Sequence, residues 1–280
     1  MLARIKSYAK INLALNVIGK RNSLHEIETI VAFVSLYDEI IIKSTSSANH
    51  NISFNGKFSR NITKNNTISK LLTILEKKKL LKGKKFRIQI KKNIPNKAGL
   101  GGGSMNAASI LSLLVKKKII KVTRKELIEI SKLVGSDVVL GLNPYNTILN
   151  SSEKIKHFSK YKKIHTLIVK PNFGCSTKEI YSKIKKFNKP KFNNPKKKMF
   201  NLGYLGKMNN SLEPIVLSKY NKLNIMKLFL ENLIGTVFVR MTGSGSAFVA
   251  YFNSKERCDN AKKQFNKRFK NYWCISSKTI

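Results

Sequence analysis

The stretch Ile94-Pro-Asn-Lys-Ala-Gly-Leu-Gly-Gly-Gly-Ser104 decides how the rest of this sequence is interpreted. An alternating run over 84–92 precedes it and predicts a strand. After it, apolar residues recur on one face of a predicted helix: Ala107, Ala108, Leu111, Leu114 and Val115. Backbone N–H groups can approach a phosphate closely where side chains are absent, and a helix N-terminus is electropositive. A glycine-rich phosphate loop is therefore predicted here.

Two well-known phosphate loops do not fit this stretch. The P-loop requires Gly-Lys followed by Ser or Thr, and no such tripeptide follows here. The dinucleotide fingerprint G-x-G-x-x-G would place Ser104 at its third glycine, and the acidic residue further on, Glu126, belongs to a helix-capping pattern. The sequence favours a phosphate loop of a third kind, with a plain flexible turn as the alternative.

Working outward, the chain alternates between strand and helix patterns. Ile11, Leu13, Leu15 and Val17 predict a half-buried strand, with Lys10 and Asn12 on the face opposite the core. Further strands are predicted at 27–43, 164–170, 236–241 and 246–252. Helices are predicted after Asn66, from Thr123 to Gly135, and over 177–187, 218–233 and 255–269.

The lysine-dense stretches 154–163 and 183–198 are typical of solvated loops or linkers. This pattern predicts an α+β fold in two domains, 1–150 and 151–280.

The charge is extreme for a chain of this length. The 280 residues carry 55 Lys+Arg and 14 Asp+Glu, which gives a net charge of +41. Such a chain attracts anions such as nucleic acid, an anionic membrane or phosphorylated small molecules. A general compositional drift toward Lys, Ile and Asn explains the same excess without a specific partner.

Cysteine usage and hydropathy restrict the setting. Cys175, Cys258 and Cys274 are far apart and show no metal-binding spacing, so neither a disulfide framework nor a bound metal cluster is expected. The longest apolar runs fall short of the roughly 18 residues that a membrane span needs. We therefore expect a cytoplasmic protein with no membrane partner.

The glycine stretch also resembles a known family. Pro95-x-x-x-Gly99-Leu-Gly-Gly-Gly-Ser104 is similar to the phosphate-binding motif of the GHMP kinases, which include galactokinase, homoserine kinase and mevalonate kinase. Six other segments resemble the family in the same order: Ala9–Leu13, His25–Thr29, Gly135–Val138, Pro171–Thr177, Asn210–Pro214 and Thr242–Ser246. The resemblance spans nearly the whole chain. It implies an N-terminal ATP-binding domain like ribosomal protein S5 and a C-terminal α/β sandwich. We expect a monomer or homodimer.

The resemblance assigns roles for phosphoryl transfer from ATP with Mg²⁺. Asp137 would accept the proton of the acceptor hydroxyl, and Lys10 beside it would stabilise the developing negative charge. Taken alone, Lys10 fits a solvated strand and Asp137 a helix N-cap. Ser104 would contact phosphate or Mg²⁺, or cap the helix. The residues assigned to ATP are Pro95, Asn96, Lys97, Ala98, Gly99, Leu100, Gly101, Gly102, Gly103, Ser104 and Met105, with Lys92 and Asn66 framing the nucleotide.

The resemblance is sharpest to members whose acceptor carries a cytidine diphosphate. In that case His25 would read the cytosine edge, with Asn12 near the substrate, and Thr177 and Tyr181 would border and stack on the base. By themselves, His25 and Tyr181 also fit ordinary core or surface positions. This sequence departs from the family pattern where Leu24 replaces an aromatic, Met105 a serine and Val139 a proline.

Two other functions remain open from the sequence. A mevalonate- or homoserine-type kinase would share the glycine loop, but those acceptors carry no base for Tyr181 to stack on. A nucleic-acid-binding protein would account for the lysines, but no RNA or DNA motif is present. We therefore expect small-molecule substrates and no specific nucleic-acid partner.

Overall fold

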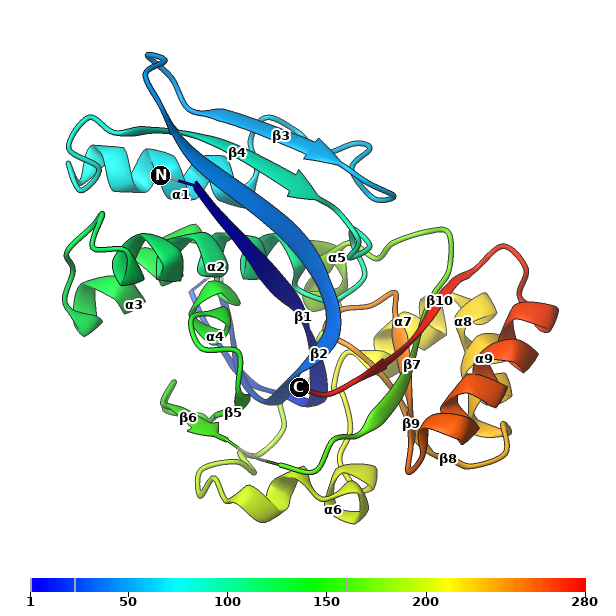
Figure 1. Ribbon diagram of the computed structural model, residues 1–280. Helices are drawn as coiled ribbons and strands as arrows, with labels where there is room; N and C mark the ends of the chain where they lie inside the picture. The colour runs from blue at the N-terminus through cyan, green and yellow to red at the C-terminus, as the bar shows by residue number, and fades with distance from the viewer. Residues whose placement is uncertain (1, 23, 160) are drawn as a thin grey trace. The chain divides into compact units, whose positions relative to one another are not determined.

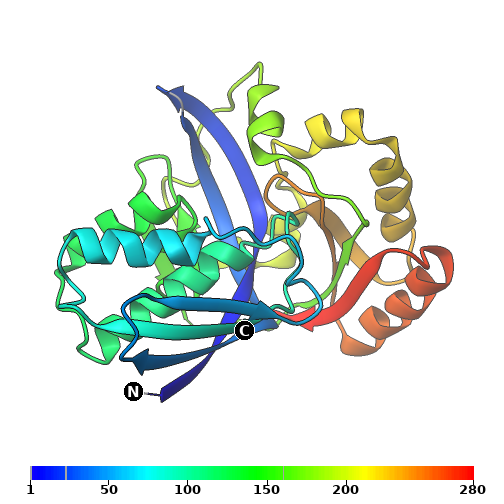
Figure 2. The ribbon, with the colours of Figure 1, turned by 90° about the horizontal axis from the view of Figure 1, so that it is seen from above.

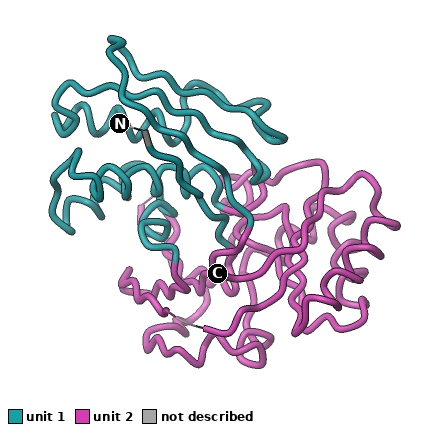
Figure 3. Tube along the Cα trace, viewed as in Figure 1, with its two compact units in different colours: residues 1–10, 36–96, 101–144 teal, residues 11–35, 97–100, 145–280 magenta. Residues whose placement is uncertain are grey.

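The computed structural model describes residues 2–22, 24–159 and 161–280. The chain forms two compact units (Figure 3). Unit 1 comprises residues 1–10, 36–96 and 101–144, and unit 2 comprises residues 11–35, 97–100 and 145–280. Two long strands, β1 (Leu2–Arg21) and β2 (Leu24–Thr45), contribute to both units. Unit 2 thus takes segments from the first 150 residues, and the division into domains at residue 150 stays a prediction.

Unit 1 is a sheet with helices along one side (Figure 1). Strand β4 (Lys85–Lys91) pairs antiparallel with β2 and parallel with β3 (Asn51–Asn55). The predicted alternation in β4 is confirmed, since Phe86, Ile88 and Ile90 are buried. The helices are α1 (Thr67–Lys77), α2 (Gly102–Lys116), α3 (Arg124–Val134) and α4 (Val138–Gly141). Their apolar faces and the sheet share one hydrophobic core.

The helix ends of unit 1 follow the predicted capping signals. Asn66 caps α1 by accepting hydrogen bonds from the backbone N–H groups of Ile68 and Ser69. Thr123 and Glu126 form the predicted capping box of α3. Gly135 then ends that helix and places Asp137 at the start of α4. Local sequence signals therefore explain why Asp137 stands in the turn between α3 and α4.

Unit 2 contains a four-stranded antiparallel sheet in the order β10-β7-β9-β8. These strands span Trp273–Lys278, His165–Lys170, Phe248–Phe252 and Thr236–Met241. Helices α8 (Asn221–Glu231) and α9 (Lys255–Arg268) cover one face of this sheet (Figures 1 and 2). Strand β5 (Asn146–Leu149) pairs with β2 and with β6 (Ile155–Phe158). The remaining elements are α5 (Thr177–Ser182), η1 (Lys197–Phe200), α6 (Leu202–Gly206) and α7 (Glu213–Lys219). The predicted α+β class is confirmed.

Several predicted elements were wrong in their limits. The helix expected over 218–233 begins only at Asn221, as α8, because Tyr220 leaves helical geometry (φ −125°, ψ 85°); residues 218 and 219 are instead the end of α7. The helix expected over 177–187 ends at Ser182. The stretch 154–163, expected to be a solvated loop, contains strand β6, whose pairing with β5 tolerates an exposed Lys156.

The strand face that carries Lys10 and Asn12 was expected to lie opposite the core, which is also wrong. Both residues are buried, at 3% and 2% exposure. Polar side chains are tolerated there because they find partners, which for Lys10 is the carboxylate of Asp137. Burial restricts what these polar groups can contact and makes them candidates for function.

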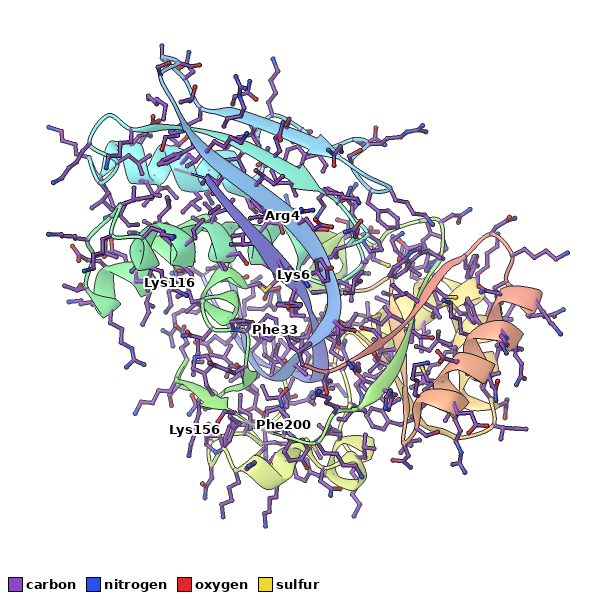
Figure 4. The ribbon with its side chains drawn as sticks, viewed as in Figure 1. Arg4, Lys6, Phe33, Lys116, Lys156 and Phe200 are labelled. Carbon is purple, nitrogen blue, oxygen red and sulfur yellow. The ribbon has the colours of Figure 1, made fainter. Side chains whose placement is uncertain are left out.

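Most of the lysines lie at the surface. Figure 4 shows long side chains projecting from the ribbon, among them Lys116 at the end of α2 and Lys156 on β6. It also marks Phe33 and Phe200, which are buried in unit 2. Over the described ranges, no helix is both long enough and apolar enough to span a bilayer.

Candidate active site

The glycine loop depends on two glycines in left-handed conformations. Gly99 has φ +71°, and a Cβ there would lie 1.9 Å from the carbonyl oxygen of Thr242 within unit 2. Gly101 has φ +69°, and a Cβ there would lie 2.8 Å from Cγ of Lys10 within unit 1. Larger residues would therefore strain the backbone and displace a neighbour at both positions.

Helix α2 begins directly at this loop and lacks a side-chain cap. Its N-cap residue is Gly101, which offers no side-chain hydrogen bond in the described structure, whereas Asn66, Thr123 and Ser254 cap α1, α3 and α9. The first N–H groups of a helix have no acceptor within the helix. A 15-residue helix that starts with bare backbone suits an anion at its N-terminus.

The buried carboxylate of Asp38 binds the residues just before the glycine loop and the helix that follows it. Asp38 is fully buried and pairs with the ammonium group of Lys92. Its Oδ1 accepts hydrogen bonds from the backbone N–H groups of Asn93 and Ile94, at 2.7 and 2.8 Å. Its Oδ2 also accepts one from Nδ2 of Asn106 on α2, at 2.9 Å. Asp38 thus ties the end of β4 to α2.

This network places a cation at the start of α2. A Cβ on Gly102 would lie 3.2 Å from Nζ of Lys92, so the ammonium group lies against the first turn of the helix. Sequence reasoning missed Asp38, although an aspartate two residues before the apolar run Ile40–Ile42 was a signal for a buried, partnered carboxylate.

Lys10 and Asp137 meet in unit 1. Nζ of Lys10 lies 3.2 Å from Oδ2 of Asp137, and the two side chains are 4% and 32% exposed. Asp137 stands at the N-cap position of α4, yet its side chain makes no capping hydrogen bond within the described residues. A Cβ on Gly135 would lie 4.0 Å from Oγ of Ser104, so the Gly135–Asp137 turn lies near the start of α2. The arrangement can remove a proton from a hydroxyl group and hold negative charge.

In unit 2, a second glycine motif holds the first part of the glycine loop. The hydroxyl group of Thr242 donates to the carbonyl oxygen of Gly99 at 3.0 Å. The backbone N–H groups of Ser246 and Ala247 donate to the carbonyls of Lys97 and Ala98, both at 3.4 Å. The Thr242–Ser246 motif therefore acts as a clamp on residues 97–99.

The polar residues expected near the acceptor are also in unit 2. The backbone N–H of Asn12 donates to Oγ1 of Thr242 at 3.0 Å, and its Nδ2 donates to Oγ1 of Thr29 at 2.9 Å. The hydroxyl groups of Thr177 and Ser244 lie 2.8 Å apart. The side chain of Asn12 is therefore fixed in orientation, and Thr177 is exposed at the start of α5.

His25 packs against Tyr181. Their ring centroids are 5.0 Å apart with planes at 43°. Burial and the nearby charge of Lys20 lower the pKa of His25 below its ordinary value. Tyr181 also packs on the hydrophobic core of unit 2, so its expected stacking role and its core role are compatible. Leu24, next to His25, is 75% exposed, while Ser23 lies outside the described residues.

The comparisons with known proteins agree with this geometry. The family model for the GHMP kinases N terminal domain matches residues 66–144. Over 277 residues the chain is 54% identical to the 4-diphosphocytidyl-2-C-methyl-D-erythritol kinase of Pelagibacter ubique, with 99% of each chain covered. This chain belongs to the 4-diphosphocytidyl-2-C-methyl-D-erythritol kinase family. A second family member, from Clostridium perfringens, is 32% identical over 258 residues, which cover 89% of this chain and 88% of that protein.

A solved structure supports the fold. The crystal structure of a 4-(cytidine 5'-diphospho)-2C-methyl-D-erythritol kinase superposes with a TM-score of 0.79 at 23% identity, covering 99% of this chain and 100% of the other. The chain is thus an ATP-dependent kinase with the GHMP kinase fold, as the sequence predicted.

The expected ATP residues of this kinase fall into two groups. Lys97–Leu100 belong to unit 2, whereas Pro95, Asn96 and Gly101–Met105 belong to unit 1 with Lys10 and Asp137. Met105, which replaces a serine of the family pattern, is buried against Gly141 and offers no polar group to a phosphate. Asn96 donates its side-chain amide to the carbonyl of Phe58 at 2.8 Å. The described residues contain no cluster of His, Cys, Asp or Glu that could hold a metal ion alone.

Proposed function

We propose that this chain transfers the γ-phosphoryl group of ATP to the 2-hydroxyl group of 4-diphosphocytidyl-2-C-methyl-D-erythritol. The products are the 2-phosphate and ADP, and the reaction belongs to the non-mevalonate route to isoprenoids. Full-length similarity to a kinase of that name supports this assignment. The contact between Lys10 and Asp137 is the observation that carries it, because transfer to an alcohol needs a proton acceptor beside a cation.

Asp137 removes the proton from the 2-hydroxyl group as the oxygen attacks the γ-phosphorus. Its carboxylate is partly exposed and so is accessible to a substrate hydroxyl. The buried ammonium group of Lys10 lies beside it and stabilises the alkoxide-like oxygen. The pair thus divides the work between a base that is open to substrate and a cation that is fixed by burial.

The start of α2 binds the phosphates of ATP. Its uncapped N–H groups and the ammonium group of Lys92 face the same turn, so backbone dipoles and a full charge act together on an anion. Mg²⁺, when bound, neutralises phosphate charge during transfer. The hydroxyl group of Ser104 fits as its protein ligand, since Mg²⁺ in kinases is held largely by phosphate oxygens and a few protein oxygens.

His25 and Tyr181 recognise the cytosine of the acceptor. The lowered pKa of His25 favours its neutral form, which has one N–H donor and one nitrogen acceptor for the edge of a base. Tyr181 offers an aromatic face next to it. Asn12 and Thr177 lie in the same unit and supply polar contacts to the rest of the acceptor.

An ADP-release assay with three acceptors tests the proposal. The purified chain with ATP and Mg²⁺ should turn over the cytidine substrate and leave mevalonate and homoserine unreacted, and ³¹P NMR should place the new phosphate on the 2-hydroxyl group. Turnover of mevalonate or homoserine in preference to the cytidine substrate would contradict the assignment. We also infer a cytoplasmic monomer or homodimer, which size-exclusion chromatography with light scattering would resolve.

A further inference from the structure

The lysine-dense segment 183–198, which follows α5, is bonded to the rest of unit 2, although its composition is typical of a linker. Glu28 is fully buried and accepts hydrogen bonds from the backbone N–H groups of Lys191 and Phe192, at 2.6 and 2.9 Å. The same carboxylate accepts a third from Nδ2 of Asn16, at 2.8 Å. A buried carboxylate with three donors fixes the backbone it binds.

Further bonds fix the residues just before this point. The backbone N–H of Asn188 donates to the carbonyl of Val17 at 2.9 Å, and its Nδ2 contacts Oγ of Ser211 at 2.9 Å. Nδ2 of Asn16 also donates to the carbonyl of Lys189 at 3.0 Å. Residues 188–192 are therefore tied to β1 and to β2, the strand that carries His25.

Phe187 immediately precedes this tied stretch, and its ring stays at the surface. The residue is 48% exposed, whereas Phe192 at the far end of the stretch is 2% exposed. The ring centroid of Phe187 lies 6.4 Å from that of His25, whose other aromatic neighbour is Tyr181. The ring of Tyr181, on α5, and the ring of Phe187, which follows α5, thus both lie next to the imidazole of His25.

Leu24 is the other apolar candidate near His25. It is 75% exposed and has no ring to stack on a base. The aromatic surface next to His25 comes from Tyr181 and Phe187 instead.

We propose that Phe187 is a specificity-determining residue that packs its ring on the cytosine of the acceptor next to His25 and Tyr181. This inference rests on the proposed function, because it takes the cytidine substrate as given. The anchored backbone at Asn188 holds the ring beside His25 before substrate arrives, which lowers the entropy cost of stacking. An aromatic ring held half-exposed beside a neutral imidazole is suited to a flat base.

The test compares Phe187→Ala with Phe187→Tyr. At saturating ATP, Phe187→Ala should raise KM for the cytidine substrate by roughly 5- to 100-fold, in keeping with the truncation of other base-stacking aromatics. Its kcat, its KM for ATP and its melting temperature should stay near wild-type values. Phe187→Tyr should restore KM, since it restores the ring. Leu228→Ala, which removes a 58% exposed side chain on α8, is the matched control and should change nothing.

A KM for Phe187→Ala within twofold of wild type, with Tyr181→Ala raising KM as expected, would overturn the inference. If Phe187→Ala melts early, Phe187→Leu keeps an apolar side chain without a ring and should show the same KM increase. Calorimetric titration of cytidine 5′-diphosphate separates this inference from the proposed function. Wild type that binds it more tightly than Phe187→Ala supports the aromatic contact even if turnover fails, and equal binding by both contradicts it.

Discussion

Nζ of Lys10 lies 3.2 Å from Oδ2 of Asp137, and burial divides the pair unequally: the lysine side chain is 4% exposed and the aspartate 32%. A lysine so enclosed cannot turn to solvent, so its charge is directed at the carboxylate and at whatever lies beside it. The aspartate retains a face for substrate. This difference supports the proposed roles, with the cation as a fixed part of the site and the carboxylate as the reacting part.

Asp137→Asn should abolish most turnover without unfolding the chain. The change is nearly isosteric and removes the proton acceptor, a contribution of about 10²- to 10⁴-fold in kcat. ATP affinity and melting temperature should remain near wild type. Glu129→Gln, which alters a carboxylate paired with Lys78 on the surface, serves as the control for loss of charge. Near-normal kcat in a folded Asp137→Asn enzyme would refute the role of Asp137.

Gly101→Ala should weaken ATP binding far more than Gly83→Ala. Both glycines have positive φ, +69° and +77°, so each alanine carries a similar backbone strain of about 1–2 kcal/mol. A Cβ at Gly101 also meets the side chain of Lys10 at 2.8 Å, while nothing lies within 4 Å at Gly83. Gly101→Ala should therefore lose more stability than Gly83→Ala, and only Gly101→Ala should raise the Kd for ATP. Equal ATP affinities would favour the interpretation of the loop as a plain turn.

Local signals in the sequence predicted most elements of unit 1. The capping residues Asn66 and Thr123, the alternation of β4 and the stop at Gly135 each act over a few residues, and all were confirmed. The break at Tyr220 was missed because the apolar spacing continues across it while the backbone does not. Secondary structure is predictable where its cause is local.

Buried polar residues were the hardest to predict. Asp38 is bound by residues at 92–94 and 106, and Glu28 by residues at 191–192, so the reason for each lies far along the chain. Lys10 was expected on a solvated face because alternation indicates which face is apolar and does not indicate what covers the other. The roles of Lys10, Asp137 and the glycine loop came from a family resemblance and stay predictions until the variants are measured.

Lys92→Met should destabilise unit 1 strongly. The change leaves the fully buried carboxylate of Asp38 without its cation, a loss that costs about 3–5 kcal/mol when one partner of a buried pair is removed. Lys85→Met breaks a half-exposed pair with Glu76 and should cost no more than about 1 kcal/mol. Urea unfolding of both variants makes the comparison. A small loss for Lys92→Met would indicate that the N–H donors alone satisfy Asp38.

Lys118→Gly should stabilise the chain. Helix α2 ends in a Schellman motif, in which the N–H of Ile119 donates to the carbonyl of Leu114 and Lys118 has φ +55°. A lysine in this conformation carries a strain that glycine avoids, so the free energy of unfolding should rise by up to about 1 kcal/mol. Lys79→Gly at the end of α1, where φ is +56°, should behave alike. Lys117→Gly, at the preceding position with φ −83°, should give no such gain.

The acceptor site should weaken as pH falls, because of His25. Burial and Lys20 hold the pKa of His25 below its ordinary value of 6.5 in the folded chain. The neutral form therefore prevails at pH 7, and acidification through the lowered pKa adds a charge that the site disfavours. KM for the cytidine substrate should rise over that range, while KM for ATP should stay unchanged. His25→Gln, which cannot titrate, should remove the pH dependence of KM.

The lowered pKa of His25 also makes the stability of the folded chain depend on pH. Below pH 6.5 the unfolded chain binds a proton at His25 more readily than the folded chain does, so the contribution of this residue to stability falls as pH decreases. Thermal unfolding of wild type and His25→Gln at pH 7.5 and at pH 5.5 measures it, and wild type should lose more melting temperature than the variant. If both lose equally, another group is responsible. If the KM of wild type for the cytidine substrate does not change with pH, protonation of His25 does not weaken binding of the cytosine.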